Sequence, residues 1–361
     1  MRNLPSVDAT TVAPHIDRTD AAVWRGGRDI AVESVPVPAL TRGEVLVQVR
    51  LATVCGSDRH TVSGRRDQPC PSVLGHETVG EIVEIAAGGA RDVDGEPLRV
   101  GQRVIWSVTL GCGVCDRCRR GMTAKCRTVR KAGHEALNSE WGLSGGYARH
   151  VLLPTGLAIA VVDDEIDDAV AAPAACATST VMAVVERTGG LTDRRVVVVG
   201  AGMLGLTAVA AAAWGGASTV TSVDVDGGRR DLAGRFGATT AVATVAEAGS
   251  TDVLWEFSGS SSALQDGLRA LDVQGVAVLA GAVAPDADVA MAPESVVRRH
   301  LAIFGVHNYE PRHLTSALRF LRDTSRRFVW SDLVAPPRPL DDVAGLLLEP
   351  PGEAPRYAVA P

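Results

Sequence analysis

One continuous segment of the chain has the pattern of a nucleotide-binding βαβ unit. Residues 194–226 read RRVVVVGAGMLGLTAVAAAAWGGASTVTSVDVD: a run of four valines, then Gly200, Gly202 and Gly205, an alanine-rich helical stretch and a second apolar strand. Glycines at this spacing between a strand and a helix are typical of a turn that places a pyrophosphate on the helix N-terminus. We therefore predict a doubly wound parallel sheet, with VLWEFSG, GVAVLAG and LAIFGVHN as its further strands.

The same unit predicts the cofactor. The glycines and Leu204 would lie against the pyrophosphate, and Asp224, 19 residues after Gly205, would hold the adenosine ribose hydroxyls. A carboxylate there repels the 2′-phosphate of NADP, so the sequence favours NAD. Arg229 leaves an alternative open, because a guanidinium five residues later can accept a phosphate or can be an ordinary solvated helix residue.

Four of the seven cysteines lie in one short loop, GCGVCDRCRRGMTAKC, with the spacing C-x2-C-x2-C-x7-C. Such short gaps let one loop surround a single tetrahedral ion, and zinc suits four thiolates. Four sulfur ligands leave no open position, so this metal would stabilise the fold. The arginines between the cysteines offset the negative zinc centre or are solvated. The predicted structural ligands are Cys112, Cys115, Cys118 and Cys126.

Composition limits the partners. The 361 residues suffice for two domains, and a formal charge of −6 gives no general attraction to nucleic acid or anionic lipid. The first twenty residues lack the apolar core of a secretory signal. The most apolar stretch, AVAAPAACATSTVMAVV, is interrupted by Pro173 and three hydroxyl residues, so we expect no membrane span and a cytoplasmic protein.

A second set of metal ligands is scattered along the chain. Cys55, His76 and Cys176 would supply two thiolates and one imidazole, which leaves one position free on a catalytic zinc. An open zinc is a Lewis acid for an alcohol or carbonyl oxygen. Asp58 could orient the imidazole. Cys70 has no such neighbours and is expected to be a spare thiol.

Together these motifs resemble the medium-chain, zinc-dependent alcohol dehydrogenases from about residue 22 to the C-terminus. The resemblance implies a GroES-like, mainly β catalytic domain combined with a Rossmann domain. It divides the chain into a loose leader (1–21), a catalytic domain (22–172) with its structural zinc lobe (111–127), the Rossmann domain (173–308) and a C-terminal part that completes the catalytic domain (309–361). A homodimer or homotetramer with two zinc ions per chain is expected.

The resemblance also implies residue roles. Ser57 and His60, two and five residues after the first ligand, would pass the substrate proton to solvent. Glu77 matches the acid beside the second ligand, and Thr180 the residue beside the nicotinamide. Arg356, in GEAPRYAV, matches a late arginine that reaches the cofactor pyrophosphate in liver-type members.

Two departures bear on the substrate. Gly56 stands where liver-type enzymes have an arginine, as in the sorbitol and polyol branch, yet that branch often has a glutamate where this chain has Cys176. The stretches KAGHEAL, PAACATSTVMA and GVHNYEPRHL resemble alcohol dehydrogenases associated with phosphonate catabolism, and related sequences include cyclitol dehydrogenases. Both groups imply polar, often anionic, hydroxylated substrates.

We therefore expect reversible NAD-linked oxidation of a secondary alcohol on a polyol, cyclitol or phosphorylated analogue. An NADPH-linked carbonyl or enone reductase is the alternative enzyme, and a zinc- and nucleotide-binding sensor without turnover is the alternative of another class. His307 and Asn308 follow an apolar strand and either contact a polar substrate or cap the strand. Trp106 either forms the opposite wall of the pocket or lies in the core.

Overall fold

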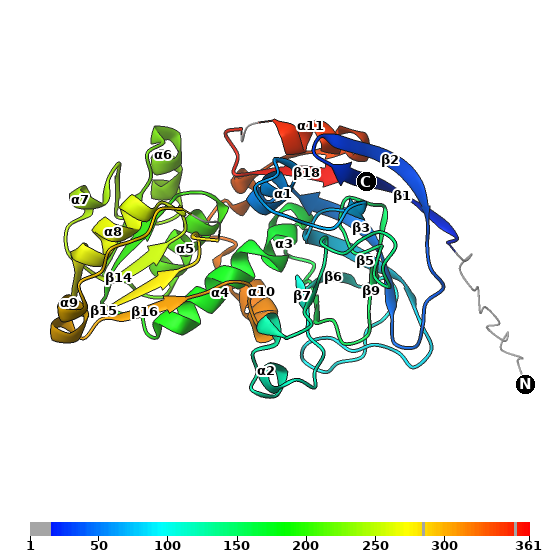
Figure 1. Ribbon diagram of the computed structural model, residues 1–361, viewed down its shortest axis with the longest axis horizontal. Helices are drawn as coiled ribbons and strands as arrows, with labels where there is room; N and C mark the ends of the chain where they lie inside the picture. Colours follow the sequence, from blue (N-terminus) through cyan, green and yellow to red (C-terminus); the bar gives the residue numbers. More distant parts are fainter. Residues whose placement is uncertain (1–15, 284–285, 350–351) are drawn as a thin grey trace, which may run out of the picture.

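The computed structural model describes residues 16–283, 286–349 and 352–361 and shows two sheet regions side by side (Figure 1). One region is a six-stranded, all-parallel sheet in the order β13-β12-β11-β14-β15-β16. This order, in which the first strand lies inside and the connection reverses beside it, is the doubly wound arrangement. The predicted Rossmann fold is confirmed. Its strands are β11 (Arg195–Val199), β12 (Thr219–Val223), β13 (Thr240–Val242), β14 (Thr251–Glu256), β15 (Leu271–Leu279) and β16 (Ala302–Gly305).

Close packing explains two of the glycines in this region. Gly200 has φ +94°, and a Cβ there would approach Ser258 N within 2.9 Å. A Cβ on Gly205 would lie 1.6 Å from the carbonyl oxygen of Gly200, so only glycine lets the helix start against the strand. The helices of this region are α5 (Met203–Trp214), α6 (Gly227–Arg235), α7 (Val245–Ala248), α8 (Ser261–Ala270) and α9 (Pro293–Arg299).

The other region is mainly β-structure. A seven-stranded sheet has the order β10-β6-β5-β3-β18-β17, with β9 also paired to β3, and a three-stranded sheet has the order β2-β1-β4. The predicted GroES-like, strand-rich domain is confirmed. Its strands are β1 (Arg18–Gly26), β2 (Asp29–Pro36), β3 (Val45–Thr53), β4 (Ser72–Val73), β5 (Glu77–Ile85), β6 (Arg103–Trp106), β7 (Thr109–Leu110), β8 (Arg130–Lys131), β9 (His150–Leu153), β10 (Ile159–Val161), β17 (Val334–Pro339) and β18 (Arg356–Ala360).

Segments near the two ends of the sequence lie in the same region of the fold. Strand β1 begins at Arg18, inside the range 1–21 that we predicted to be a loose leader, whereas residues 1–15 of that leader lie outside the described residues. The last strand, β18, pairs antiparallel with β3, with Ala358 opposite Thr53. The final residues therefore complete a sheet that was begun some 300 positions earlier in the sequence.

Two longer helices lie between the two sheet regions. The short helices α3 (Asp168–Ala171) and η2 (Ala172–Ala175) lead into α4 (Ala177–Thr188), against which α10 (Arg312–Thr324) packs. Figure 1 shows α4 and α10 between the two regions. Within the described ranges, no single helix is long and apolar enough to cross a membrane, and only the bent pair 168–175 and 177–188 reaches that length and composition. The remaining helices are α1 (Gly56–Val62), α2 (Asp116–Arg119), η1 (Thr123–Lys125), η3 (Trp330–Leu333), η4 (Leu340–Asp342) and α11 (Val343–Leu348).

Candidate active site

The scattered metal ligands meet at one point. Cys55 follows β3, His76 precedes β5, and the pairing of Thr53 with Glu77 brings these two neighbours together. Cys176 precedes α4, and its sulfur completes a group whose three donor atoms lie within 4.8 Å of one another. Cys55 and His76 are buried, and Cys176 is half-buried. Two thiols and one imidazole at this separation fit a zinc ion that keeps one position for a substrate.

Asp58 organises the imidazole. Its Oδ1 lies 3.2 Å from Nδ1 of His76, in an ion-pair contact that is not aligned as a hydrogen bond. Burial lowers the pKa of His76, but Asp58 and Cys55 together outweigh burial and raise this pKa above its usual value. The other oxygen of Asp58 accepts hydrogen bonds from the Cys55 backbone (3.1 Å) and from the Tyr147 hydroxyl (2.8 Å). Nδ1 therefore faces the carboxylate, and Nε2 is the atom left for a metal.

Ser57 lies beside that free nitrogen. Its hydroxyl is 3.3 Å from Nε2 of His76, the ring atom that faces away from Asp58. His60 is three residues further along α1, on the same face of the helix, and is half-buried. Its ring has no hydrogen bond to another described residue.

Glu77 and Arg356 form a buried ion pair next to the ligands. The guanidinium donates to both carboxylate oxygens, at 2.7 and 3.0 Å, and its Nη2 lies 3.7 Å from the sulfur of Cys55. Thr53 donates a further hydrogen bond to Glu77. Burial raises the pKa of Glu77, and the positive charge of Arg356 opposes the rise. Glu77 thus holds the guanidinium of Arg356 beside the ligand cluster, and the contact of Arg356 with the cofactor pyrophosphate stays a prediction.

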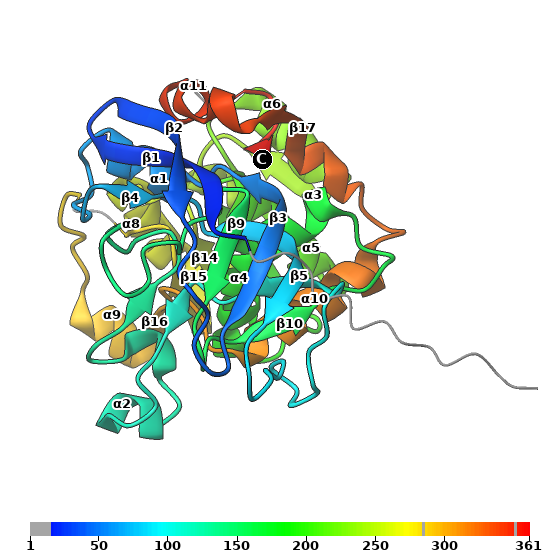
Figure 2. The same ribbon diagram turned by 90° about the vertical axis from the view of Figure 1, so that its right-hand side faces the viewer.

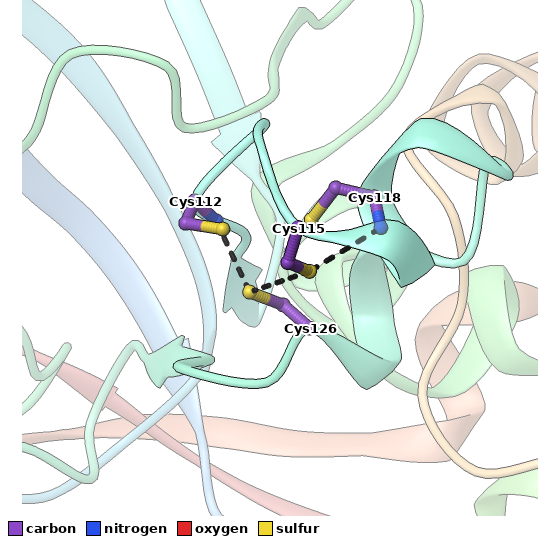
Figure 3. Close-up of side chains that lie close together, drawn as sticks. All are labelled: Cys112, Cys115, Cys118 and Cys126. Atoms are coloured by element: carbon purple, nitrogen blue, oxygen red, sulfur yellow. Dashed lines mark hydrogen bonds between the residues drawn. The ribbon is translucent and has the colours of Figure 1, made fainter.

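The four clustered cysteines lie in a loop that extends from the β-rich region around α2 (Figures 2 and 3). Their sulfurs also lie within 4.8 Å of one another. Backbone N–H groups point at them: Cys112 N lies 3.2 Å from Cys126 Sγ, and Cys118 N lies 3.5 Å from Cys115 Sγ. Such N–H groups, first that of Arg127, lower the pKa of Cys115 to about 6. The loop is suited to four thiolates around one closed metal site.

The nucleotide residues cluster at the glycine turn. Asp224 accepts a hydrogen bond from the backbone of Ala201 at 2.6 Å, so its carboxylate is fixed against the turn. The Arg229 guanidinium lies 3.5 Å from the position of a Cβ on Gly202 and so reaches the same turn. Leu204 is in the first turn of α5. Thr180, on α4, donates to the carbonyl of Cys176 at 2.7 Å, which places it beside the metal ligands.

The predicted substrate pocket needs one correction. Trp106 is only 2% exposed and packs in the apolar core of the β-rich region, so it forms no pocket wall. His307 is exposed and its Nδ1 lies 2.7 Å from the ammonium of Lys125, beside the cysteine loop. Asn308 has φ +60°, and its Nδ2 is buried without a hydrogen-bond partner among the described residues.

Sequence reasoning missed two residues at the ligand cluster. Tyr147 fixes Asp58 through its hydroxyl, and the ring of His134 lies 5.1 Å from the ring of His76. His134 lies in the stretch KAGHEAL, which we noted only for its resemblance to other sequences. Neither residue has a spacing relative to the ligands that marks it, because both come from loops that the fold brings to the site.

Comparisons with known proteins agree with the fold. Residues 41–163 match the alcohol dehydrogenase GroES-like domain, and residues 173–346 match the glucose dehydrogenase C-terminus. The chain is 31% identical over 299 residues to an L-threonine 3-dehydrogenase of Edwardsiella ictaluri, covering 78% of this chain and 82% of the relative. It is 29% identical to a 5-exo-hydroxycamphor dehydrogenase of Pseudomonas putida over 91% of this chain and 97% of the relative.

An alcohol dehydrogenase of Thermotoga maritima has the same fold, with a TM-score of 0.87 and 26% identity over 95% of this chain and 99% of that one. Fold and comparisons thus define a dehydrogenase that combines a GroES-like domain with a Rossmann domain. The chain belongs to the medium-chain, zinc-type alcohol dehydrogenase family. It is an oxidoreductase of the alcohol dehydrogenase type, and this family acts on small molecules with a nicotinamide cofactor.

Proposed function

We propose that the protein catalyses the reversible, NAD-linked oxidation of a secondary alcohol to a ketone on a polyol, cyclitol, or phosphorylated or phosphonate hydroxy compound. The observation that carries this proposal is the cluster of three metal-donor atoms with the Ser57 hydroxyl beside Nε2 of His76. Cys55, His76 and Cys176 would hold a zinc ion, which when bound supplies Lewis acidity toward an alcohol oxygen.

The chain's own residues then handle the proton. The Ser57 hydroxyl is placed to accept it from the substrate alcohol, and His60, one helical turn further on, to receive it and pass it to solvent. The carboxylate of Asp58 holds the His76 ring in place during this transfer. Burial of the cluster keeps bulk water from the reacting carbon.

Cofactor choice follows from the glycine turn. The backbone N–H groups at the start of α5 would bind the pyrophosphate, and Thr180 would support the nicotinamide beside Cys176. The fixed carboxylate of Asp224 disfavours a 2′-phosphate, which supports NAD. The approach of Arg229 to Gly202 favours the second candidate, an NADPH-linked carbonyl or enone reductase. We also propose two zinc ions per chain and a homodimer or homotetramer.

A substrate screen with both cofactors tests the proposal. We expect polyols, cyclitols or their phosphates to be oxidised with NAD at a kcat/KM at least about tenfold above that with NADP, because the Asp224 carboxylate disfavours the 2′-phosphate. A tenfold preference corresponds to about 1.4 kcal/mol. Asp224→Ser should narrow that ratio. His76→Ala should leave a folded protein that still binds NADH but lacks one metal and all turnover. A wild-type enzyme that uses both cofactors equally, or that oxidises only simple primary alcohols, would contradict the proposal.

A further inference from the structure

The chain contains only two lysines among its 36 basic Lys and Arg residues, and the fold brings both to one place. Lys125 ends η1 in the cysteine loop, and Lys131 lies in β8. Arg66, which follows α1, and His307, which follows β16, come to the same place from distant parts of the sequence. Lysine presents a compact, strongly hydrated charge on a flexible stem, which suits a site that must adjust to a ligand.

Arg66, Lys125 and Lys131 are cations, whereas His307 is a neutral acceptor for the ammonium of Lys125. The ammonium of Lys125 lies 2.7 Å from Nδ1 of His307. Burial first, and then the charges of Arg66 and Lys125, lower the pKa of Lys131. Partial burial of the ring, followed by the charges of Lys125, Lys131 and Arg66, lowers the pKa of His307 to about 4. In the part of the chain that the structure describes, no ion pair involves Arg66, Lys125 or Lys131. Neighbouring cations repel one another, and an anion bound among them would offset this repulsion.

The nearby acids are engaged elsewhere. Glu135 accepts a hydrogen bond from the backbone of Lys131 at 2.8 Å, and Glu310 accepts from the backbones of Thr123 and Ala124. Both carboxylates moderate the positive potential, Glu135 at Lys131 and Glu310 at Lys125, yet neither contacts an ammonium group. Apart from the contact of Lys125 with His307, the side-chain donors of Arg66, Lys125 and Lys131 have no acceptor among the described residues.

The cluster adjoins the metal ligands. His134, three residues after Lys131, lies with its ring 5.1 Å from the ring of His76, and the positive charge of Arg66 acts on it. Nδ1 of His134 lies 2.7 Å from the carbonyl of Ala132, so Nδ1 carries the proton of a neutral ring and Nε2 is an acceptor without a partner among the described residues. His134 therefore lies near both the metal ligand His76 and the cation Arg66.

We propose that Arg66, Lys125, Lys131 and His307 form a subsite for a phosphate or phosphonate group of the substrate, while His134 accepts a hydrogen bond from one of its hydroxyls. This inference rests on the proposed function, which leaves open whether the substrate is charged. Three cations match a doubly charged group better than a single carboxylate. The cofactor pyrophosphate is not the occupant, because β16 lies three strands from β11, about 14 Å at the usual strand spacing.

Direct binding tests the subsite without turnover. In the zinc-loaded full chain with saturating NADH, reductive ¹³C-methylation labels both lysines and preserves their charge. Lys125→Arg and Lys131→Arg assign the two NMR signals. We expect inorganic phosphate and methylphosphonate to shift both signals with one shared dissociation constant, and acetate to bind more weakly. Signals that do not move, or that move equally with chloride at the same ionic strength, overturn the proposal.

A matched pair of variants locates the site. Arg66→Gln removes one cation without removing a probe and should weaken phosphate binding by about fivefold or more. Arg119→Gln makes the same charge change at an exposed position of α2. Arg119 has no hydrogen bond to a residue of the proposed subsite, so this variant should leave phosphate affinity within about twofold. Equal weakening by both variants would show general attraction only and would overturn the subsite.

Kinetics separates this inference from the proposed function. For a neutral polyol and its phosphate ester, Arg66→Gln should lower kcat/KM for the ester by about fivefold more than for the neutral compound. Oxidation of neutral polyols together with no phosphate binding would overturn the subsite and leave the proposed function standing. Phosphate binding together with no alcohol oxidation would retain the subsite and overturn the function.

Discussion

At the scale of single residues, the pair Glu77–Arg356 shows how charge is arranged beside the metal ligands. Both side chains are buried, and the guanidinium also approaches the sulfur of Cys55. The two thiols of the ligand cluster differ in acidity: the hydrogen bond between them lowers the pKa of Cys55 and raises the pKa of Cys176. Arg356 thus favours negative charge on Cys55 and on Glu77 alike, which suits a site built to bind a cation.

Replacing Arg356 by Met should destabilise the protein by about 3–5 kcal/mol, because a buried carboxylate loses its partner. The pKa of Glu77 is already raised in the folded state, and the change should raise it further. Stability contributed by a group with a raised folded pKa is present below its unfolded pKa and lost as the pH rises through the folded pKa. The destabilisation, measured by urea unfolding against wild type, should therefore be larger at about pH 8.5 than at about pH 6.

The compensating change supplies the control. In the Arg356→Met background, Glu77→Gln replaces the carboxylate by a neutral amide of the same shape. We expect the double variant to regain part of the lost stability and to lose the additional pH dependence. A destabilisation that is the same at both pH values would mean that lost packing of Arg356, and not the unpaired carboxylate, is responsible.

At the scale of elements, the sequence predicted those turns, loops and strands that have a pattern within a short stretch of residues. Three local patterns appear in the structure where the sequence placed them: the glycines of the turn before α5, the three apolar strands β14, β15 and β16, and the C-x2-C-x2-C-x7-C loop. Cys55, His76 and Cys176 could be grouped only by their chemistry, since β3, β5 and α4 meet through long-range pairing. Trp106 illustrates the limit, because a core tryptophan and a pocket wall are alike in sequence.

The cluster of Arg66, Lys125, Lys131 and His307 shows that residues grouped only by the fold cannot be grouped from the sequence. Its members come from the end of α1, the cysteine loop, β8 and the turn after β16, so no window of sequence contains them all. The scarcity of lysine was visible in the sequence, yet it indicated no partner. Similarly, the pairing of Arg356 with Glu77 depends on how β18 enters the sheet beside β3, which the residues of β18 alone do not specify.

The cysteine loop is an element whose stability we expect to depend on metal. Glu310, just before α10, accepts hydrogen bonds from Thr123 and Ala124 and so attaches the loop to the rest of the molecule. Cys115→Ser should remove one metal equivalent per chain, lower stability by about 2 kcal/mol or more, and expose residues 111–127 to proteolysis. Elemental analysis and limited proteolysis measure this. Cys70→Ser, at an exposed thiol outside both clusters, should change neither.

At the scale of the whole molecule, the candidate active site depends on segments from both ends of the chain. β18 lies between β3 and β17 in the seven-stranded sheet, and β3 leads directly to Cys55. α4, which directly follows Cys176, is buried against α5 and α10. The ligand cluster is therefore fixed only when the first and last segments of the β-rich region and the start of α4 are all in place.

Ala358→Pro tests this dependence. Ala358 is fully buried and pairs with Thr53, so proline would disrupt the strand that joins the two ends of the chain. We expect a loss of at least about 3 kcal/mol of stability, with loss of the metal held by Cys55 but retention of the metal in the cysteine loop. Glu353→Pro, at an exposed position before β18, is the matched control and should keep both metals. If Ala358→Pro retained full metal content and turnover, β18 would not be needed to hold the site, and the coupling between the chain ends would be refuted.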